Sequence, residues 1–153
     1  MNVILDPTDI QIHHIHFQES VKNTIIEGSD FIRIIYSNEL FSLNGIYIEI
    51  ELDTSHVEKY FNKYKYILNK NSEKNMNNII RISQLEKEIL EKANISGKKC
   101  PIYKISEHLQ SGNIKLFTEN SLSSSNGVNK YLLKISGIWE NETEYGITFK
   151  FGD

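Results

Sequence analysis

The chain has 153 residues and a mass of 17.8 kDa; 39% of its residues are hydrophobic, 24% charged and 10% aromatic. These values exclude disorder over the whole length, and we expect a single domain over residues 1–153. The formal net charge of −3 argues against tight, non-specific duplex binding by the whole chain. No apolar run reaches the roughly 20 residues of a membrane span, and no signal-peptide pattern opens the chain. We therefore expect an intracellular protein with no membrane partner.

Isoleucine, asparagine and lysine are over-represented, with 24, 16 and 15 residues, whereas alanine occurs once. The codons for these three residues are AT-rich, which points to a source with an AT-rich genome, such as many large viruses. The physical consequence is a cationic surface built from lysine, a point charge, and almost no arginine. The single cysteine, Cys100, excludes an intramolecular disulfide and a cysteine-based zinc cluster.

Strand patterns open the chain. Residues 10–17, 31–36 and 46–52 are rich in isoleucine and aromatic residues, and residues 46–52 alternate strictly between isoleucine or leucine and polar side chains. An alternation with a period of two is typical of a strand with one buried face. Turn-forming residues between the second and third segments predict an antiparallel pair.

The middle of the chain changes period. Ser55 and Glu58 have the spacing of a capping box, and apolar residues follow at helical intervals up to Leu68, so the pattern predicts a helix over 57–68. The asparagine-rich segment 69–78 predicts a flexible loop. A second amphipathic helix is predicted over 79–93.

The last third returns to strands. We expect an extended segment at 102–103, one helical turn at 106–110, a short strand at 114–117 and a flexible loop at 119–129. A hairpin of residues 131–139 and 145–151 closes the chain, and its last strand alternates regularly. The order predicts an α+β fold: a mainly antiparallel sheet, either an OB-like barrel or a β-sandwich, with two helices inserted between the N-terminal strands and a C-terminal hairpin.

Two pairs of segments carry a resemblance to known proteins. Residues 31–37 (FIRIIYS) with 43–47 (LNGIY), and 133–140 (LKISGIWE) with 145–151 (YGITFKF), resemble small proteins of nucleocytoplasmic large DNA viruses. The closing hairpin is also similar to the last two strands of OB-fold single-stranded-DNA-binding proteins of large viruses and phages. The resemblance implies a viral DNA-binding protein or virion component, located in the host cytoplasm or a viral factory.

Lysines and tyrosines make up the candidate binding surface. A lysine-lined face with interspersed tyrosines can hold a single strand by attracting phosphates and stacking on bases. The candidate nucleic-acid-binding residues are Lys59, Lys63, Tyr66, Lys70, Lys130, Lys134 and Lys150. The alternative interpretation of these lysines is a solvated surface that only keeps the protein soluble.

Histidines and carboxylates suggest two further sites. If residues 10–17 form a strand, His14 and His16 point to one face, a spacing that can supply two metal ligands, although a third ligand must come from elsewhere. Carboxylates line residues 49–53 and 140–144. Paired carboxylates can bind Mg²⁺ or act as acid and base, but we interpret the first set as the solvated face of a strand and the second as a solvated turn. Glycine-rich phosphate loops, HExxH and GxSxG motifs are all missing from the sequence.

The leading hypothesis is a non-enzymatic protein, without a cofactor, that binds single-stranded nucleic acid. The alternative is a viral structural or protein–protein interaction module, facing the virion or the host, that adds a strand or docks a helix on a partner. A second alternative is a metal-dependent enzyme centred on His14 and His16.

Overall fold

The computed structural model describes residues 3–117 and 128–152. This part of the chain contains two α-helices, α1 (Glu73–Ala93) and α2 (Lys104–Gln110), and two short 3-10 helices, η1 (Pro7–Asp9) and η2 (Ile12–His14). Its strands are β1 (Ile4–Leu5), β2 (Ile15–Phe17), β3 (Val21–Lys22), β4 (Asp30–Ser37), β5 (Ser42–Asn44), β6 (Ile46–Tyr60), β7 (Lys63–Leu68), β8 (Cys100–Ile102), β9 (Asn113–Leu116), β10 (Val128–Glu140) and β11 (Glu144–Phe151).

Strand β10 is the centre of one large sheet with the main order β2-β4-β10-β6-β7-β9. The first part of β10 pairs with β6 and the last part with β4, while β11 also pairs with β10. All pairings are antiparallel except β1 with β6 and β8 with β11. The predicted α+β class with a mainly antiparallel sheet is thus confirmed, and the sheet is not closed into a barrel.

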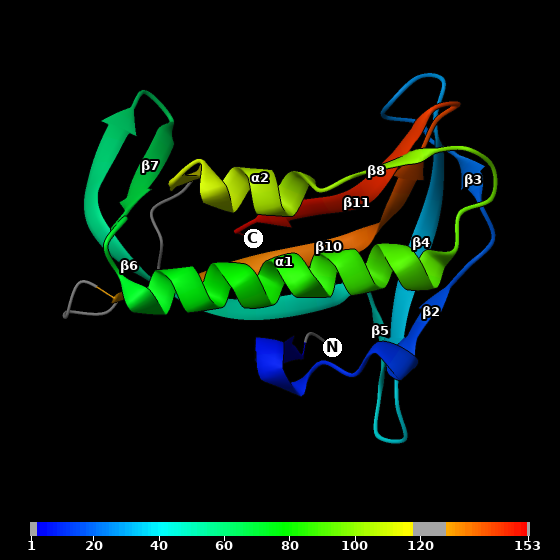
Figure 1. Ribbon diagram of the computed structural model, residues 1–153, viewed down its shortest axis with the longest axis horizontal. Helices are drawn as coiled ribbons and strands as arrows, with labels where there is room; N and C mark the ends of the chain where they lie inside the picture. Colours follow the sequence, from blue (N-terminus) through cyan, green and yellow to red (C-terminus); the bar gives the residue numbers. More distant parts are fainter. Residues whose placement is uncertain (1–2, 118–127, 153) are drawn as a thin grey trace.

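The two helices lie across one face of the sheet, where β6, β10 and β11 pass behind them (Figure 1). The predicted alternation of residues 46–52 is confirmed, because Ile46, Ile48, Ile50 and Leu52 are buried toward the helices. Helix α1 covers them with Ile82, Leu85, Ile89 and Leu90. The burial of these aliphatic side chains between sheet and helices is the main stabilising contribution to the fold.

The segment predicted as the first helix is a β-hairpin. Strand β6 continues to Tyr60 and turns at Phe61 and Asn62 into β7, which pairs with it antiparallel. Ser55 lies at an irregularity of β6 between Thr54 and His56 and does not cap a helix. The helical prediction over 57–68 is therefore wrong. Its apolar residues belong to both faces of the hairpin and to its tip, and only by coincidence follow a helical interval.

The asparagine-rich segment is shorter as a loop than predicted. Helix α1 starts at Glu73, capped by the Ser72 side chain, so residues 73–78 are its first two turns. The N-terminal strand 10–17 is also shortened, because residues 12–14 form η2 and only β2 remains. Strand β4, the closing hairpin and the helical turn at 106–110 are confirmed. The predicted loop at 119–129 lies outside the described residues, apart from the first two residues of β10.

Residues 49–53 of β6 pair with β10 along one edge, but along the other edge the pairing with β7 begins only at Thr54, and asparagines of α1 occupy this unpaired edge. Asn75 accepts the Asp53 N–H at 2.6 Å and donates to the Asp53 carbonyl at 2.8 Å and the Asn69 carbonyl at 3.1 Å. Asn78 donates to the Glu51 carbonyl at 2.6 Å. Asn75 is only 3% exposed, so its amide replaces a neighbouring strand at a site that water does not reach.

Helix α2 depends on a carboxylate supplied by α1. Glu86, 1% exposed, accepts the Ile105 N–H at 2.8 Å and the Ser106 N–H and hydroxyl at 3.0 and 2.6 Å. The residue at the N-cap position of α2, Tyr103, makes no side-chain cap. A seven-residue helix is marginal in isolation, and an anion at its N-terminus satisfies its free amides and interacts favourably with its dipole.

Replacing Asn75 with alanine should lower the free energy of unfolding by about 1–3 kcal/mol, because the Asp53 N–H loses its partner, while the Asp53 carbonyl keeps the Asn69 N–H. Chemical denaturation followed by circular dichroism measures this change. Asn77→Ala, at an exposed position of the same helix turn, is the matched control and should stay within about 0.5 kcal/mol of wild type. Equal stabilities of the two variants would show that the edge of β6 does not need Asn75.

Replacing Glu86 with glutamine should destabilise the fold by about 2–4 kcal/mol. Both carboxylate oxygens accept hydrogen bonds, and in glutamine one of them becomes an NH₂ group that faces another donor. The same denaturation experiment applies. Glu91→Gln, exposed in the last turn of α1, removes the same charge without a buried partner and should change little. A stability of Glu86→Gln within 0.5 kcal/mol of that control, on the scale of ordinary surface changes, would contradict the capping role.

Candidate nucleic-acid interface

The three strands β6, β7 and β9 form a small sheet at one end of the molecule, where α1 begins and α2 ends (Figure 1). Cross-strand partners share a face of a sheet, so the pairing register places Glu58, Lys65 and Lys115 in one row across this sheet. Tyr60 and Lys63 form the next row on the same side. Phe117 follows β9 and lies beside Lys63. We call this surface the hairpin face; its residues are Glu58, Tyr60, Lys63, Lys65, Lys115 and Phe117.

The hairpin face points away from the core. The alternate row of the same three strands contains Tyr66 and Ile114, which are 3% and 0% exposed and pack into the core. Because side chains alternate between the two faces of a sheet, their neighbours Lys65 and Lys115 must face solvent. The register of three strands therefore aligns basic side chains that are 50 residues apart in the sequence.

The hairpin face carries three lysines and one glutamate, a local excess of two positive charges on a chain whose net charge is −3. The Lys63 ammonium lies 5.5 Å from the centre of the Phe117 ring, within the range of a cation–π contact. In the described part of the chain, no acidic side chain lies within 4 Å of the ammonium groups of Lys63, Lys65 or Lys115. These cations are therefore available to an external anion.

Glu58 is the acidic member of the hairpin face. The Tyr60 hydroxyl donates to it at 2.7 Å, and this hydrogen bond lowers the pKa of Glu58. Glu58 in turn raises the pKa of Tyr60, because the carboxylate accepts a hydrogen bond from the protonated phenol. His56 lies 3.5 Å from the same carboxylate. The carboxylate thus stays ionised at neutral pH, holds Tyr60 against β6 and offsets one of the three lysines.

Phe61 at the hairpin tip is fully exposed, with a relative accessibility of 102% and a φ of 43°. Two-residue hairpins favour glycine, asparagine or aspartate at positions with positive φ, and a left-handed conformation costs other residues about 1–2 kcal/mol. The neighbouring Tyr60 and Phe117 are also largely exposed. The end of this hairpin therefore presents aromatic rings to solvent beside lysines.

The structure separates the predicted binding residues of the middle segment. Lys63 belongs to the hairpin face, but Lys59 lies on the opposite face of the hairpin, 5.5 Å from the centre of the Tyr64 ring. Tyr66 is buried and packs edge-on against Tyr131, so it cannot stack on a base as predicted. Lys70 lies in the turn before α1, with its side chain beside Gly112.

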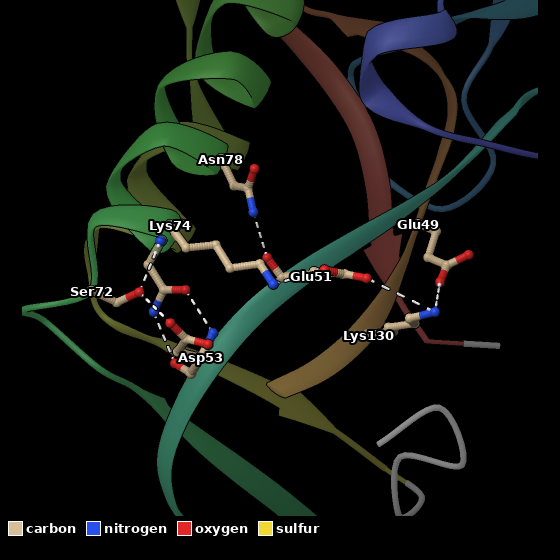
Figure 2. A network of polar contacts seen from close by, with 8 residues as sticks. Glu49, Glu51, Asp53, Ser72, Lys74, Asn78 and Lys130 are labelled. Atoms are coloured by element: carbon tan, nitrogen blue, oxygen red, sulfur yellow. Dashed lines mark hydrogen bonds and ion pairs between the residues drawn. The ribbon is translucent and has the colours of Figure 1, made fainter. Parts of the chain in front are cut away.

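Lys130 belongs to a network of charges on the outer side of β6 and β10. Figure 2 shows its ammonium between Glu49 and Glu51, at 3.3 and 3.9 Å, and Lys74 of α1 at 2.8 Å from Glu51. Beside this network the Ser72 hydroxyl donates to the Asp53 carboxylate (Figure 2). The carboxylates of the predicted row thus have a structural role as partners of lysines. Lys130 lies among these acids, which a phosphate would have to displace.

Lys134 and Lys150 pair directly across β10 and β11. The Lys134 ammonium lies 5.3 Å from the centre of the ring of Tyr47, its partner on β6. These lysines form a second basic row, separated from the hairpin face by the acidic part of β6. Tyr47 and Glu58 are eleven residues apart along β6, a separation of up to about 36 Å at 3.3 Å per residue. The predicted set therefore does not form one surface.

The sequence prediction missed Lys65, Lys115, Phe61 and Phe117. Their positions follow from the hairpin, and the helical interpretation of residues 57–68 concealed it. One signal could have revealed it: residues 63–66 read Lys-Tyr-Lys-Tyr, an alternation with the period of a strand, directly after the turn-forming Asn62. Lys115 lies on a separate strand, and its place beside Lys65 requires the register.

The histidine pair does not form the predicted arrangement. His14 ends η2 and packs against Tyr36, whereas His16 belongs to β2, so the two do not alternate along one strand. No group of three potential metal ligands occurs among residues 3–117 and 128–152. The second carboxylate cluster has a structural contact too, because Glu140 pairs with Lys99 at 2.9 Å.

Searches against protein-family models, curated proteins and solved structures found no match. The resemblance to proteins of large DNA viruses therefore stays a prediction. Among the described residues, neither helix has the length and apolar character needed to cross a membrane.

Proposed function

We propose that this protein binds single-stranded nucleic acid on the hairpin face, as a non-enzymatic binding protein. The observation that carries the proposal is the alignment of Lys63, Lys65 and Lys115 with exposed aromatic rings on one outward face. Lysines attract phosphates and exposed rings stack on unpaired bases, and together they are the two components of single-strand recognition.

The dimensions of the hairpin face favour a short contact. Lys63 and Lys65 are two residues apart on β7, about 6.6 Å, and Lys65 and Lys115 are about 5 Å apart between neighbouring strands. Three lysines in this area can contact about three phosphates. Aromatic rings flank the lysines on both sides. These rings can stack only on free base faces, whereas a duplex keeps its base faces stacked on one another. These features support a single strand as the ligand.

The biological setting in this proposal follows the sequence. The AT-rich composition and the resemblance of the strand segments support a viral protein that acts inside the host cell, in the cytoplasm or a viral factory. A viral structural or protein–protein interaction module remains the competing proposal. Lysines and exposed aromatic residues also occur at protein interfaces, where arginine is the more enriched cation.

Binding of a fluorescently labelled oligothymidylate of about ten nucleotides, measured by anisotropy over a salt series, tests the proposal. Three phosphate contacts predict a slope of log K against log salt of about −2. The double variant Lys65→Gln, Lys115→Gln should bind about 30-fold more weakly at low salt, since each contact contributes about 1 kcal/mol in water. Its slope should fall to about −0.7.

The matched control is Lys87→Gln. It removes an exposed lysine in the second half of α1, away from the helix end that lies near the hairpin (Figure 1), and should leave the affinity unchanged. Absence of binding by the wild type at low ionic strength would end the proposal. A defined oligomer in solution without nucleic-acid affinity would instead favour the interaction module.

Replacing Glu58 with glutamine should strengthen binding by up to about fivefold at low salt, because it removes the one negative charge of the hairpin face. The lowered pKa of Glu58 means that the wild-type carboxylate is ionised at neutral pH. The same anisotropy titration measures the change. Glu27→Gln, an exposed acid in the turn before β4, is the control; equal effects of both variants would indicate a response to net charge alone.

A further inference from the structure

The tip of the β6–β7 hairpin combines two unfavourable features in one residue. Phe61 adopts a φ of 43°, a region that glycine enters without strain and phenylalanine does not. Its ring is fully exposed and so packs against no other part of the described chain. Phenylalanine at this position therefore stabilises neither the backbone nor the core of the free protein. A residue that the fold itself does not favour indicates a role outside the fold.

The surroundings of Phe61 identify the class of partner. Tyr60 and Lys63 pair with each other at the two ends of the turn, so Phe61 directly follows the row of the hairpin face nearest the tip. Lys63 also lies over the Phe117 ring. A partner at this tip must therefore supply both a negative charge and a flat apolar surface, as an unpaired nucleotide does.

We infer that Phe61 stacks on an unpaired base next to the strand that the lysines hold, and thereby determines the preference for single strands. This inference rests on the proposed function and adds the specificity element to it. Lysine–phosphate attraction alone is available to single strands and duplexes alike. Only a strand with a free base face gives Phe61 a stacking partner, so the ring and not the charge distinguishes the two ligands.

Phe61→Gly tests this inference, because it should raise the melting temperature and lower the affinity for the oligonucleotide. Relief of the positive φ should raise the melting temperature by about 2–4 °C. Loss of the ring should weaken oligothymidylate binding about fivefold to 150-fold, the range for removal of a base-stacking aromatic residue. The salt slope should stay at its wild-type value, because no charge changes.

Two further variants separate stacking from a change in the turn. Phe61→Asn also removes the ring and also suits a positive φ, so it should repeat the loss of affinity. Phe61→Trp keeps a stacking ring and should retain affinity, and its indole fluorescence should be quenched by the oligonucleotide. Wild-type protein, whose single tryptophan is the partly buried Trp139 on β10, is the control for that signal.

An abasic strand with the same phosphates separates the two proposals. Wild type and Phe61→Gly should bind it equally, while the lysine variants should bind it more weakly than either. If wild type binds oligothymidylate with the expected salt slope but Phe61→Gly binds it equally well, the stacking role is overturned and the proposed function stands. If wild type binds no oligonucleotide but binds phosphatidylserine vesicles in a Phe61-dependent manner, both proposals fail and the tip is a membrane anchor.

Discussion

The pairing between the side-chain amide of Asn75 and the backbone of Asp53 is the contact on which the rest of the structure depends. Strand β6 pairs with β10 along one edge up to Asp53 and with β7 along the other edge from Thr54, so the second edge would be unpaired before this crossing. A buried unpaired amide is strongly unfavourable, and an exposed one invites pairing with other chains. By supplying a donor and an acceptor in the place of a strand, Asn75 keeps the edge satisfied and fixes the start of α1 on the sheet.

A second buried cluster lies on the inner side of the same crossing. The Thr54 hydroxyl lies 2.7 Å from the Tyr131 hydroxyl, and Asn129 donates to the Thr54 oxygen at 2.8 Å. Burial raises the pKa of Tyr131, which keeps the phenol neutral and able to donate. Polar contacts on both sides of the crossing, together with the ring contact between Tyr66 and Tyr131, therefore fix the direction in which the hairpin leaves the body. On the proposed function, a hairpin held in this way loses little conformational freedom when the strand binds.

The sequence predicts those parts of the fold whose local pattern agrees with their environment. The alternation in β6 and the closing hairpin could be predicted because one buried face forces a period of two. Residues 57–68 and 69–78 could not: aromatic residues occupy both sides of the hairpin and its tip, and asparagines that favour turns in isolation are helical here because α1 packs on the edge of β6. Of the hairpin face, the sequence identified Lys63, while the alignment of Lys65 with Lys115 exists only through the strand register.

The distribution of charge along the outer side of β6 limits how far a bound strand can extend. Basic side chains lie at both ends, in the hairpin face and at Lys134 and Lys150, but Glu49, Glu51 and Asp53 lie between them. Lys74 and Lys130 neutralise only part of this acidic stretch and are engaged in doing so. A phosphate backbone passing along β6 would meet carboxylates before it met the second pair of lysines. On the proposed function, the bound segment therefore ends at the hairpin, which explains why its recognition elements, three lysines and the aromatic tip, are concentrated there.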